Sequence, residues 1–234
     1  MISICIATYN GEKYFKQQLL SILCQVNTDD EIVISDDGSS DNTLEIIHEI
    51  NDNRIKLIEG PKTGSPIDNF ENALMKAKGD YIFLSDQDDQ WMENKIEICM
   101  KYLLDYDCVI SDCHVVDKNL NIISNSFYMI NKTKKGRIYN LMIKNGYLGC
   151  CMAFKKQILD KSLPFPKNIP MHDIWIGNVA SFYYRLVFIP DKLIKFRRHG
   201  CNASPTAAKS SYTIFQKFCF RLNIIKNIIL LRLI

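Results

Sequence analysis

The sequence predicts one α/β domain with a mainly parallel sheet flanked by helices, followed by a short appendage. Three observations support this fold class. Short β-type runs alternate with helical patterns from residue 2 to residue 110, and this alternation is typical of parallel sheets. The chain has 234 residues, of which 47% are hydrophobic and 24% charged, so it suits one sizeable core.

The first half supplies the predicted sheet. Isoleucines at 2, 4 and 6 alternate with smaller residues and predict a central strand, whereas the apolar residues of 15–23 recur at helical spacing. Further strands are expected at 32–34, 55–58, 81–84 and 108–110. Helices are expected over 40–50 and 65–77, the first capped by Ser40 and the second by Ser65 followed by Pro66.

The second half is less regular. Residues 118–145 are polar and rich in Lys and Asn, which predicts a loop containing a helix. The composition changes near Pro205, so we expect a main domain over 1–205 and an amphipathic helical segment over 206–234.

The last 23 residues carry an apolar face with basic residues beside it. A helix over 212–234 would place five apolar side chains on one broad face: Phe215, Phe218, Leu222, Ile225 and Ile229. Such a helix suits contact with an anionic membrane surface. The alternative is a final helix that packs its apolar face on the domain or on a second subunit.

The composition indicates the cellular compartment of the protein and excludes one class of binding partner. The nine cysteines lie mostly in apolar runs without a CxxC pair, so we expect reduced, buried thiols. We expect no signal peptide and no membrane-spanning helix. The protein is therefore predicted to be cytoplasmic, with peripheral contact to the inner face of the membrane through 212–234. A net charge of +3 and the absence of a basic patch with interleaved aromatics predict no nucleic-acid partner.

Polar clusters follow three of the predicted strands. Thr8-Tyr9-Asn10 follows the first strand, Asp36-Asp37-Gly38 follows the second, and Asp86-Gln87-Asp88-Asp89 follows the fourth. Open α/β sheets bind ligands at the carboxyl ends of their strands. We therefore expect these clusters to meet in one site.

Asp86 and Asp88 form an Asp-x-Asp motif directly after a β run. Their hard carboxylate oxygens suit Mg²⁺ or Mn²⁺, which leave positions open for phosphate oxygens. The alternative is an acidic turn without a ligand. Asp37 could accept a hydrogen bond from a ribose hydroxyl or a base N–H, or it could belong to a helix cap.

Two later segments carry further candidates. Asp173 follows a proline-rich loop and could act as a general base, or it could cap an amphipathic helix. His199 follows two arginines, and the three cationic or polar side chains suit a diphosphate or its metal, or else form a solvated basic loop. Only one glycine follows the first strand, so a nicotinamide site of the GxGxxG type is excluded.

Taken together, these segments resemble glycosyltransferase family 2, which has the GT-A fold. The segments that carry the resemblance span residues 1–203 and occur in the family's order: ATYNGEKYFKQQLLSILCQ, EIVISDDGSSDNT, NFENALMKAKGDYIFLSDQDDQW, GCCMAF, HDIW and RRHGCN. The SDQDDxW form is similar to the branch of rhamnosyltransferases and related enzymes of cell-surface polysaccharide synthesis. One departure is Arg197-Arg198-His199, where this branch more often has Tyr-Arg-Gln-His.

The resemblance implies inverting transfer from a nucleoside-diphosphate sugar to a hydroxyl of a saccharide or lipid-linked saccharide, with Mn²⁺ or Mg²⁺ as cofactor. The implied roles are a nucleoside contact for Thr8, Tyr9 and Asp37, a ribose or metal contact for Asp86, metal binding for Asp88, a sugar and acceptor pocket at Gly149 and Cys150, the catalytic base for Asp173 and a diphosphate contact for His199.

Two other functions compete with this one. A sugar-phosphate nucleotidyltransferase would also use acidic residues and a metal, but it usually begins with a Gly-rich, arginine-containing loop that this sequence lacks. A non-catalytic sugar-nucleotide-binding or membrane scaffold protein would not need all of Asp86, Asp88 and Asp173.

Overall fold

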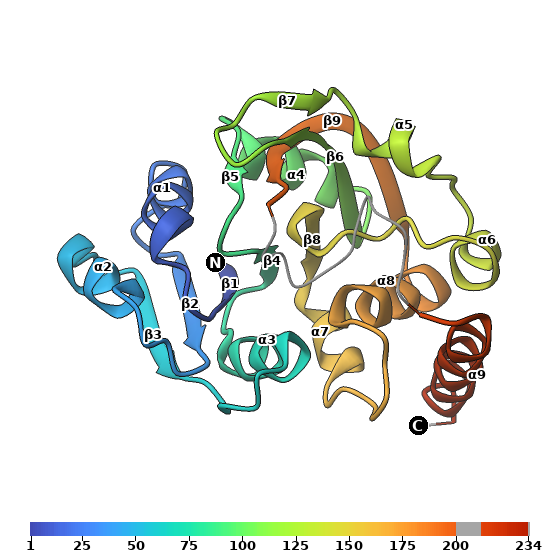
Figure 1. Ribbon diagram of the computed structural model, residues 1–234. Helices are drawn as coiled ribbons and strands as arrows, with labels where there is room; N and C mark the ends of the chain where they lie inside the picture. Colours follow the sequence, from blue (N-terminus) through green and yellow to red (C-terminus); the bar gives the residue numbers. More distant parts are fainter. Residues whose placement is uncertain (200–211, 234) are drawn as a thin grey trace.

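The computed structural model describes residues 1–199 and 212–233, and it confirms the α/β class (Figure 1). Four strands of the first half lie side by side and run parallel, in the order β3-β2-β1-β4. They are β1 (Ile2–Thr8), β2 (Glu31–Asp36), β3 (Ile55–Glu59) and β4 (Tyr81–Ser85). All four lie where the sequence predicts strands.

The sheet continues with antiparallel pairs that the sequence did not predict. Strand β8 (Met152–Lys155) lies between β4 and β6 and runs antiparallel to both. Strands β6 (Cys108–Val116) and β9 (Leu186–Arg197) are parallel to each other, and two short strands pair along them, β5 (Gln90–Trp91) and β7 (Ile122–Ser124). The sheet as a whole is therefore mixed, although its first half is parallel.

Helices cover both faces of the sheet. In Figure 1, α1 and α4 lie above the strands, whereas α3, α7 and α8 lie below them. The helices are α1 (Glu12–Leu23), α2 (Thr43–Ile50), α3 (Pro66–Lys76), α4 (Lys95–Leu103), α5 (Phe127–Asn131), α6 (Arg137–Met142), α7 (Lys156–Ser162), α8 (His172–Tyr183) and α9 (Ile214–Leu230), with the short 3-10 turn η1 (Gly149–Cys151).

One of the two predicted helix caps is confirmed. Ser65 Oγ accepts a hydrogen bond from the Asp68 amide at 3.3 Å, and Pro66 begins α3. The Ser40 cap is wrong, because α2 begins at Thr43. The Ser40 amide instead donates to Asn10 Oδ1 at 2.8 Å, so this segment joins the turn after β1 to the turn after β2.

The buried central strands fix the position of the polar clusters. Strands β1 and β2 are buried along almost their whole length, as apolar strands sandwiched between helices should be. Because β1, β2 and β4 are parallel and in register, their carboxyl ends open at one edge of the sheet. The three predicted clusters meet at this edge.

Helix α9 packs on α8 through a stripe that differs from the predicted apolar face. Ile224 and Ile228 are buried against Trp175 and Val179 of α8, together with Leu141 of α6. On the predicted face, by contrast, four side chains are exposed: Phe215, Phe218, Leu222 and Ile229. No helix in the described part of the chain is long and apolar enough to cross a membrane. The expected boundary at 205/206 lies outside the described residues.

The packing of α9 generates a stability prediction. Ile228→Ala should lower the free energy of unfolding by about 2 kcal/mol or more, because it removes buried methyl groups and leaves a cavity. Ile229→Ala is the matched control, since Ile229 is exposed and its loss should change stability by less than about 0.5 kcal/mol. Urea unfolding measures both values. Equal effects of the two variants would contradict the packing of α9 on α8.

Candidate functional site

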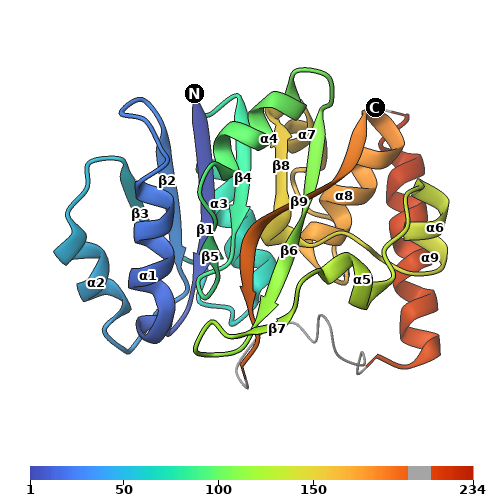
Figure 2. The same ribbon diagram turned by 90° about the horizontal axis from the view of Figure 1, so that it is seen from above.

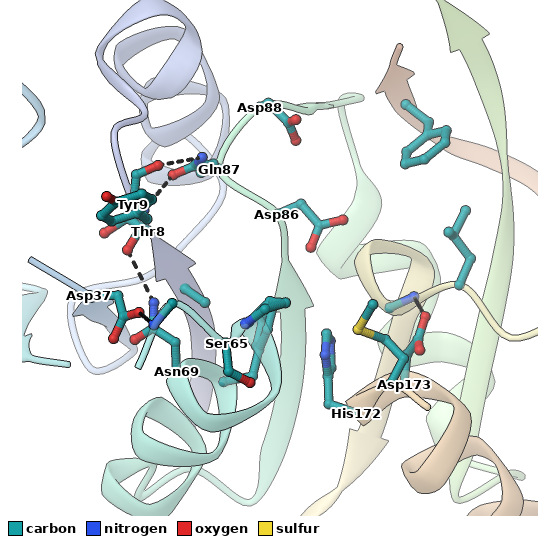
Figure 3. Close-up of a pocket in the computed structure, with 18 of the residues that line it drawn as sticks. Thr8, Tyr9, Asp37, Ser65, Asn69, Asp86, Gln87, Asp88, His172 and Asp173 are labelled. Carbon is teal, nitrogen blue, oxygen red and sulfur yellow. Dashed lines mark hydrogen bonds between the residues drawn. The ribbon is translucent and has the colours of Figure 1, made fainter. Parts of the chain in front are cut away.

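A pocket lies at the carboxyl edge of β1, β2 and β4, between these strand ends and the start of α8 (Figure 3). It brings together seven of the residues that the sequence predicted for a site: Thr8, Tyr9, Asp37, Asp86, Asp88, Gly149 and Asp173. Cys150 is fully buried beneath the pocket and is not among its lining residues. A direct donor contact for Cys150 remains a prediction.

Asp37 and Asp36 tie the β2 end of the pocket to its neighbours. The Asp37 carboxylate accepts hydrogen bonds from the amides of Lys62 at 2.6 Å and Gly64 at 2.8 Å, which positions the loop before α3. Thr8 Oγ1 donates to Asp36 at 2.9 Å, so the Thr8 hydroxyl is engaged within the protein. The ring of Tyr9 is 53% exposed and presents a flat aromatic surface at this end.

Gln87 joins the β4 end to the β1 end. Its Oε1 accepts from the Tyr9 amide at 2.9 Å, and its Nε2 donates to the Tyr9 carbonyl at 3.1 Å (Figure 3). The middle residue of the Asp-x-Asp motif therefore joins the ends of β1 and β4 by hydrogen bonds, while the two aspartates on either side line the pocket.

The acidic loop after β4 concentrates negative charge. Burial, together with repulsion from Asp88 and Asp173, raises the pKa of Asp86 to about 8. The pKa of Asp89 is raised well above its usual range by burial and by repulsion from the two other loop carboxylates, Asp88 and Asp86. Such mutual repulsion is relieved by a bound cation. The oxygen ligands fit Mg²⁺ or Mn²⁺.

Cys150 and Asp89 offer a second set of ligand atoms. Single ligand atoms of Asp86, Asp89 and Cys150 lie within 4.8 Å of one another, a spacing that could hold a metal ion. Burial raises the pKa of the Cys150 thiol well above its usual range, however, and a protonated thiol is a poor ligand. Hard ions prefer oxygen, so Asp86 and Asp88, at the pocket surface, fit a hard cation better.

Arg197 holds the acidic loop in place. Its main-chain amide donates to Asp89 Oδ1 at 2.8 Å, and its guanidinium donates to the Asp88 carbonyl at 2.7 Å. The same guanidinium also bonds the Lys118 carbonyl and Gln17, and it lies over the Tyr14 ring. The sequence grouped Arg197 with its neighbours as a diphosphate contact, but the structure buries it as an internal anchor.

Arg198 and His199 lie on the accessible side of this anchor. Arg198 lines the pocket, and burial lowers the pKa of its guanidinium. His199 Nε2 is 2.8 Å from Asp88 Oδ2, with its ring against Tyr14. The structure therefore brings the predicted His199 to the Asp-x-Asp motif.

Asp173 faces the acidic loop from the start of α8. Its Oδ2 accepts from the Gly149 amide at 2.9 Å and its Oδ1 from the Ile174 amide at 2.7 Å. Burial raises its pKa to about 6, which suits a general base near neutral pH. Asp173 is not the N-cap residue of α8, which is Met171, but its carboxylate bonds the Ile174 amide in the first turn of the helix. The catalytic role therefore stays a prediction.

Gly149 lies close to the start of α8. A Cβ at this position would lie 3.1 Å from His172 Nε2 and 3.2 Å from Asp173 Cβ. Any side chain would therefore push against both residues.

His172 is a pocket residue to which the sequence analysis gave no role. Its ring is buried, stacks on Phe70 with centroids 3.9 Å apart, and has no hydrogen-bond partner at either ring nitrogen. In Figure 3 it lies beside Asp173, on the side toward Ser65, and below Asp86. The HDIW segment could have identified His172 as a pocket residue, because it directly precedes the candidate base Asp173. Its burial and missing partners could be seen only in the structure.

The arrangement suits transfer of a group away from a phosphate. One wall carries carboxylates that fit a divalent cation, and the facing wall carries a carboxylate with the pKa of a base.

Comparisons with known sequences agree with this chemistry. Residues 3–163 match the family described as Glycosyl transferase family 2. UDP-Glc:alpha-D-GlcNAc-diphosphoundecaprenol beta-1,3-glucosyltransferase WfgD of Escherichia coli is 30% identical over 171 residues, which cover 73% of this chain and 64% of that protein. dTDP-rhamnosyl transferase RfbG of Shigella flexneri is 28% identical over 215 residues, which cover 84% of this chain and 72% of that protein.

Solved structures show the same fold. S. aureus TarS 1-349 in complex with UDP-GlcNAc superposes with a TM-score of 0.74 at 19% identity, over 97% of this chain and 66% of that chain. Mannosyltransferase PcManGT from Pyrobaculum calidifontis, in complex with GDP-Man and Mn²⁺, gives a TM-score of 0.62 at 20% identity, over 88% of this chain and 58% of that chain. The fold is thus of the GT-A type, and the chain belongs to glycosyl transferase family 2.

Proposed function

We propose that this protein is an inverting glycosyltransferase that moves a sugar from a nucleoside-diphosphate sugar to a hydroxyl of a saccharide acceptor, in the synthesis of a cell-surface polysaccharide such as O-antigen or capsule. One observation carries the proposal: the acidic loop with Asp86 and Asp88 shares a pocket with Asp173. The names of the E. coli and S. flexneri relatives, which describe sugar transfer from UDP-Glc and from dTDP-rhamnose, support the donor class.

The donor would lie along the strand ends. Its nucleoside would contact Tyr9 and Asp37. Thr8 would position them, because its hydroxyl bonds Asp36 and its carbonyl accepts from the Asp37 amide. Arg198 and His199 lie beside Asp88 and would face the diphosphate. The sugar would then reach Gly149 and Asp173, where the pocket ends at α8.

The reaction would be a single displacement. A Mn²⁺ or Mg²⁺ ion held by Asp86 and Asp88 would neutralise negative charge on the departing diphosphate. Asp173 takes the proton from the acceptor hydroxyl, and the acceptor oxygen attacks the anomeric carbon on the face opposite the diphosphate. The new carbon–oxygen bond forms as the bond to the diphosphate breaks. The products are the nucleoside diphosphate and an inverted glycosidic linkage.

The acceptor is proposed to be a saccharide or a lipid-linked saccharide, as the name of the E. coli relative says of its own substrate. Residues 1–205 would form the transferase domain, and 206–234 an appendage whose residues from 212 contact a membrane at which such an acceptor lies. The site of action would be the cytoplasmic face of that membrane.

The metal assignment predicts that Asp88→Ala lowers transfer by about 100-fold or more, because the departing diphosphate loses its electrostatic stabilisation. Asp29→Ala is the matched control, since Asp29 is an exposed aspartate remote from the pocket. Release of the nucleoside diphosphate, measured with Mn²⁺ and with EDTA, reads out both variants. Full activity of the Asp88 variant in EDTA would exclude the metal role.

The base assignment predicts that Asp173→Asn lowers kcat by about 10²–10⁴ with little change in donor affinity. Asn keeps an oxygen that can accept from the Gly149 amide. The pKa of Asp173 is raised to about 6, so its carboxylate forms as the pH rises through 6. The kcat/KM of the wild type should therefore fall below about pH 6. A variant that keeps its kcat but loses donor affinity would show that another residue is the base.

His172 is proposed to bind a hydroxyl of the bound sugar. Burial lowers its pKa to about 3, so the neutral ring offers one donor and one acceptor at physiological pH. A sugar hydroxyl both donates and accepts, and therefore matches a neutral imidazole. An anionic phosphate would match only a donor.

His172→Phe tests this contact, because phenylalanine keeps an aromatic ring for stacking on Phe70 but cannot form hydrogen bonds. The affinity for a nucleotide sugar should fall by about tenfold, while the affinity for the nucleoside diphosphate should not change. His48→Phe, on the exposed side of α2, is the control. Isothermal titration calorimetry measures both affinities. If the affinity for the nucleotide sugar is unchanged and the acceptor KM rises, His172 binds the acceptor. If both the nucleotide-sugar affinity and the acceptor KM are unchanged, His172 binds no sugar.

A further inference from the structure

Two segments far apart in the sequence hold the excess positive charge of the protein. Residues 129–144 contain five basic residues and residues 212–233 contain four, and neither segment contains an Asp or Glu. The remaining residues carry 20 of the 29 Lys and Arg and all 26 Asp and Glu, so they are net negative by six. The net charge of +3 therefore conceals a strong separation of charge.

The same two segments expose large apolar side chains. In the first segment, which includes α6, the exposed side chains are Met129, Ile130, Ile138, Met142 and Ile143. On α9 they include Ile214, Phe215, Phe218, Leu222 and Ile229. Water-exposed aromatic and aliphatic side chains gathered beside basic residues are characteristic of surfaces that enter the headgroup region of a bilayer.

The fold joins the two segments into one surface. Arg221 Nη2 donates to the Ile143 carbonyl at 3.1 Å, and Leu141 shares a buried cluster with Ile224 and Ile228. Figures 1 and 2 both show α6 and α9 together at the side of the molecule remote from α2. The sequence analysis identified basic residues beside an apolar face only in 212–234, because the pairing of this segment with 129–144 is visible only in the fold.

We propose that the surface formed by residues 129–144 and 212–233, called here the basic–apolar surface, docks the protein on a bilayer that contains anionic lipid. Its positive charge complements anionic headgroups, which attract Lys and Arg near the membrane surface. Its exposed Phe and Ile side chains favour lipid over nucleic acid, since a phosphate backbone gives aliphatic groups nothing to bury against. The surface thus extends the expected membrane contact of α9 to a second, separate segment.

The placement of this surface fits a lipid-linked acceptor. Helix α8 carries Asp173 in its first turn, and it packs against both α6 and α9 farther along. The docked surface and the base therefore belong to one rigid unit. The use of this surface to reach a lipid-linked acceptor rests on the proposed function, whereas membrane binding itself does not depend on catalysis.

The charge of the surface is tested by vesicle co-sedimentation of the whole chain. The wild type should bind phosphatidylglycerol/phosphatidylcholine vesicles, and binding should weaken with salt. Lys134→Glu with Lys135→Glu should reduce partitioning by about 25-fold or more, because each lysine lost near an anionic surface costs about a factor of five and each glutamate adds repulsion. Lys76→Glu with Lys78→Glu is the matched control, since both lysines are exposed on or just after α3. Equal effects of the two pairs would overturn the proposal.

The apolar side chains are tested in the same assay. Phe215→Ser with Phe218→Ser should reduce partitioning by about tenfold or more, and it should leave the fold intact because these side chains are 74% and 53% exposed. Met75→Ser with Leu104→Ser is the control, because these residues are 64% and 77% exposed elsewhere. The proposal is overturned if the wild type binds no anionic vesicles or binds pure phosphatidylcholine vesicles equally well.

One further outcome would reassign the surface. If the Phe215/Phe218 pair turns a dimer into a monomer in size-exclusion chromatography without reducing vesicle binding, the surface joins two copies of the chain and the lipid proposal fails. Failure of the proposed transferase function would be seen separately, as no release of nucleoside diphosphate by the wild type. That result would leave the vesicle measurements unchanged.

Discussion

The central physical constraint is the gathering of four carboxylates at one partly buried sheet edge. Asp86, Asp88 and Asp89 follow β4, and Asp173 faces them from α8. Negative charges gathered in one place destabilise one another, as the raised pKa values of Asp86 and Asp89 indicate. Buried Lys95 partly compensates from below, where its Nζ bonds the Cys150 carbonyl at 2.6 Å. A cation from solution would complete the compensation at the pocket surface, and with the proposed function it would also link this charge arrangement to the binding of a donor diphosphate.

Such a loop keeps its geometry only because hydrogen bonds from other strands hold it. Arg197, at the end of β9, binds the main chain of Asp88 and the side chain of Asp89. Gln87 is bound from the opposite side by the main chain of Tyr9. The acidic residues are therefore positioned from both halves of the sheet. This explains why the long strand β9 extends to the pocket, and why an arginine in a basic run is buried instead of exposed to a ligand.

Local patterns predicted the parallel half of the fold, and most of the predicted site residues lie in the pocket. Alternating isoleucines and strand-end polar clusters are local signals, and the register of parallel strands necessarily brings the clusters to one edge. The antiparallel β8 could not be predicted, because its pairing depends on partners far along the chain. The burial of Arg197 and the missing hydrogen-bond partners of His172 could not be predicted either, because both depend on residues far away in the sequence. Ser40 is not a cap because it lies before the N-cap position, Asn42, in a turn that bonds Asn10, and a local pattern does not reveal this contact.

Helix α8 relates the negative pocket to the positive surface. Its first turn carries Asp173, while Trp175 and Val179 contact the buried stripe of α9. The Trp175 indole also donates to the Ser162 carbonyl at 2.9 Å, which fixes α8 against α7. Four of the five charged residues that line the pocket are aspartates, and the basic–apolar surface lies across a single packed helix. An acceptor held at an anionic bilayer would then meet the base from the docked side, while the donor enters along the strand ends. With the proposed function, separation of charge within one chain would give the two substrates different approaches to the same carboxylate.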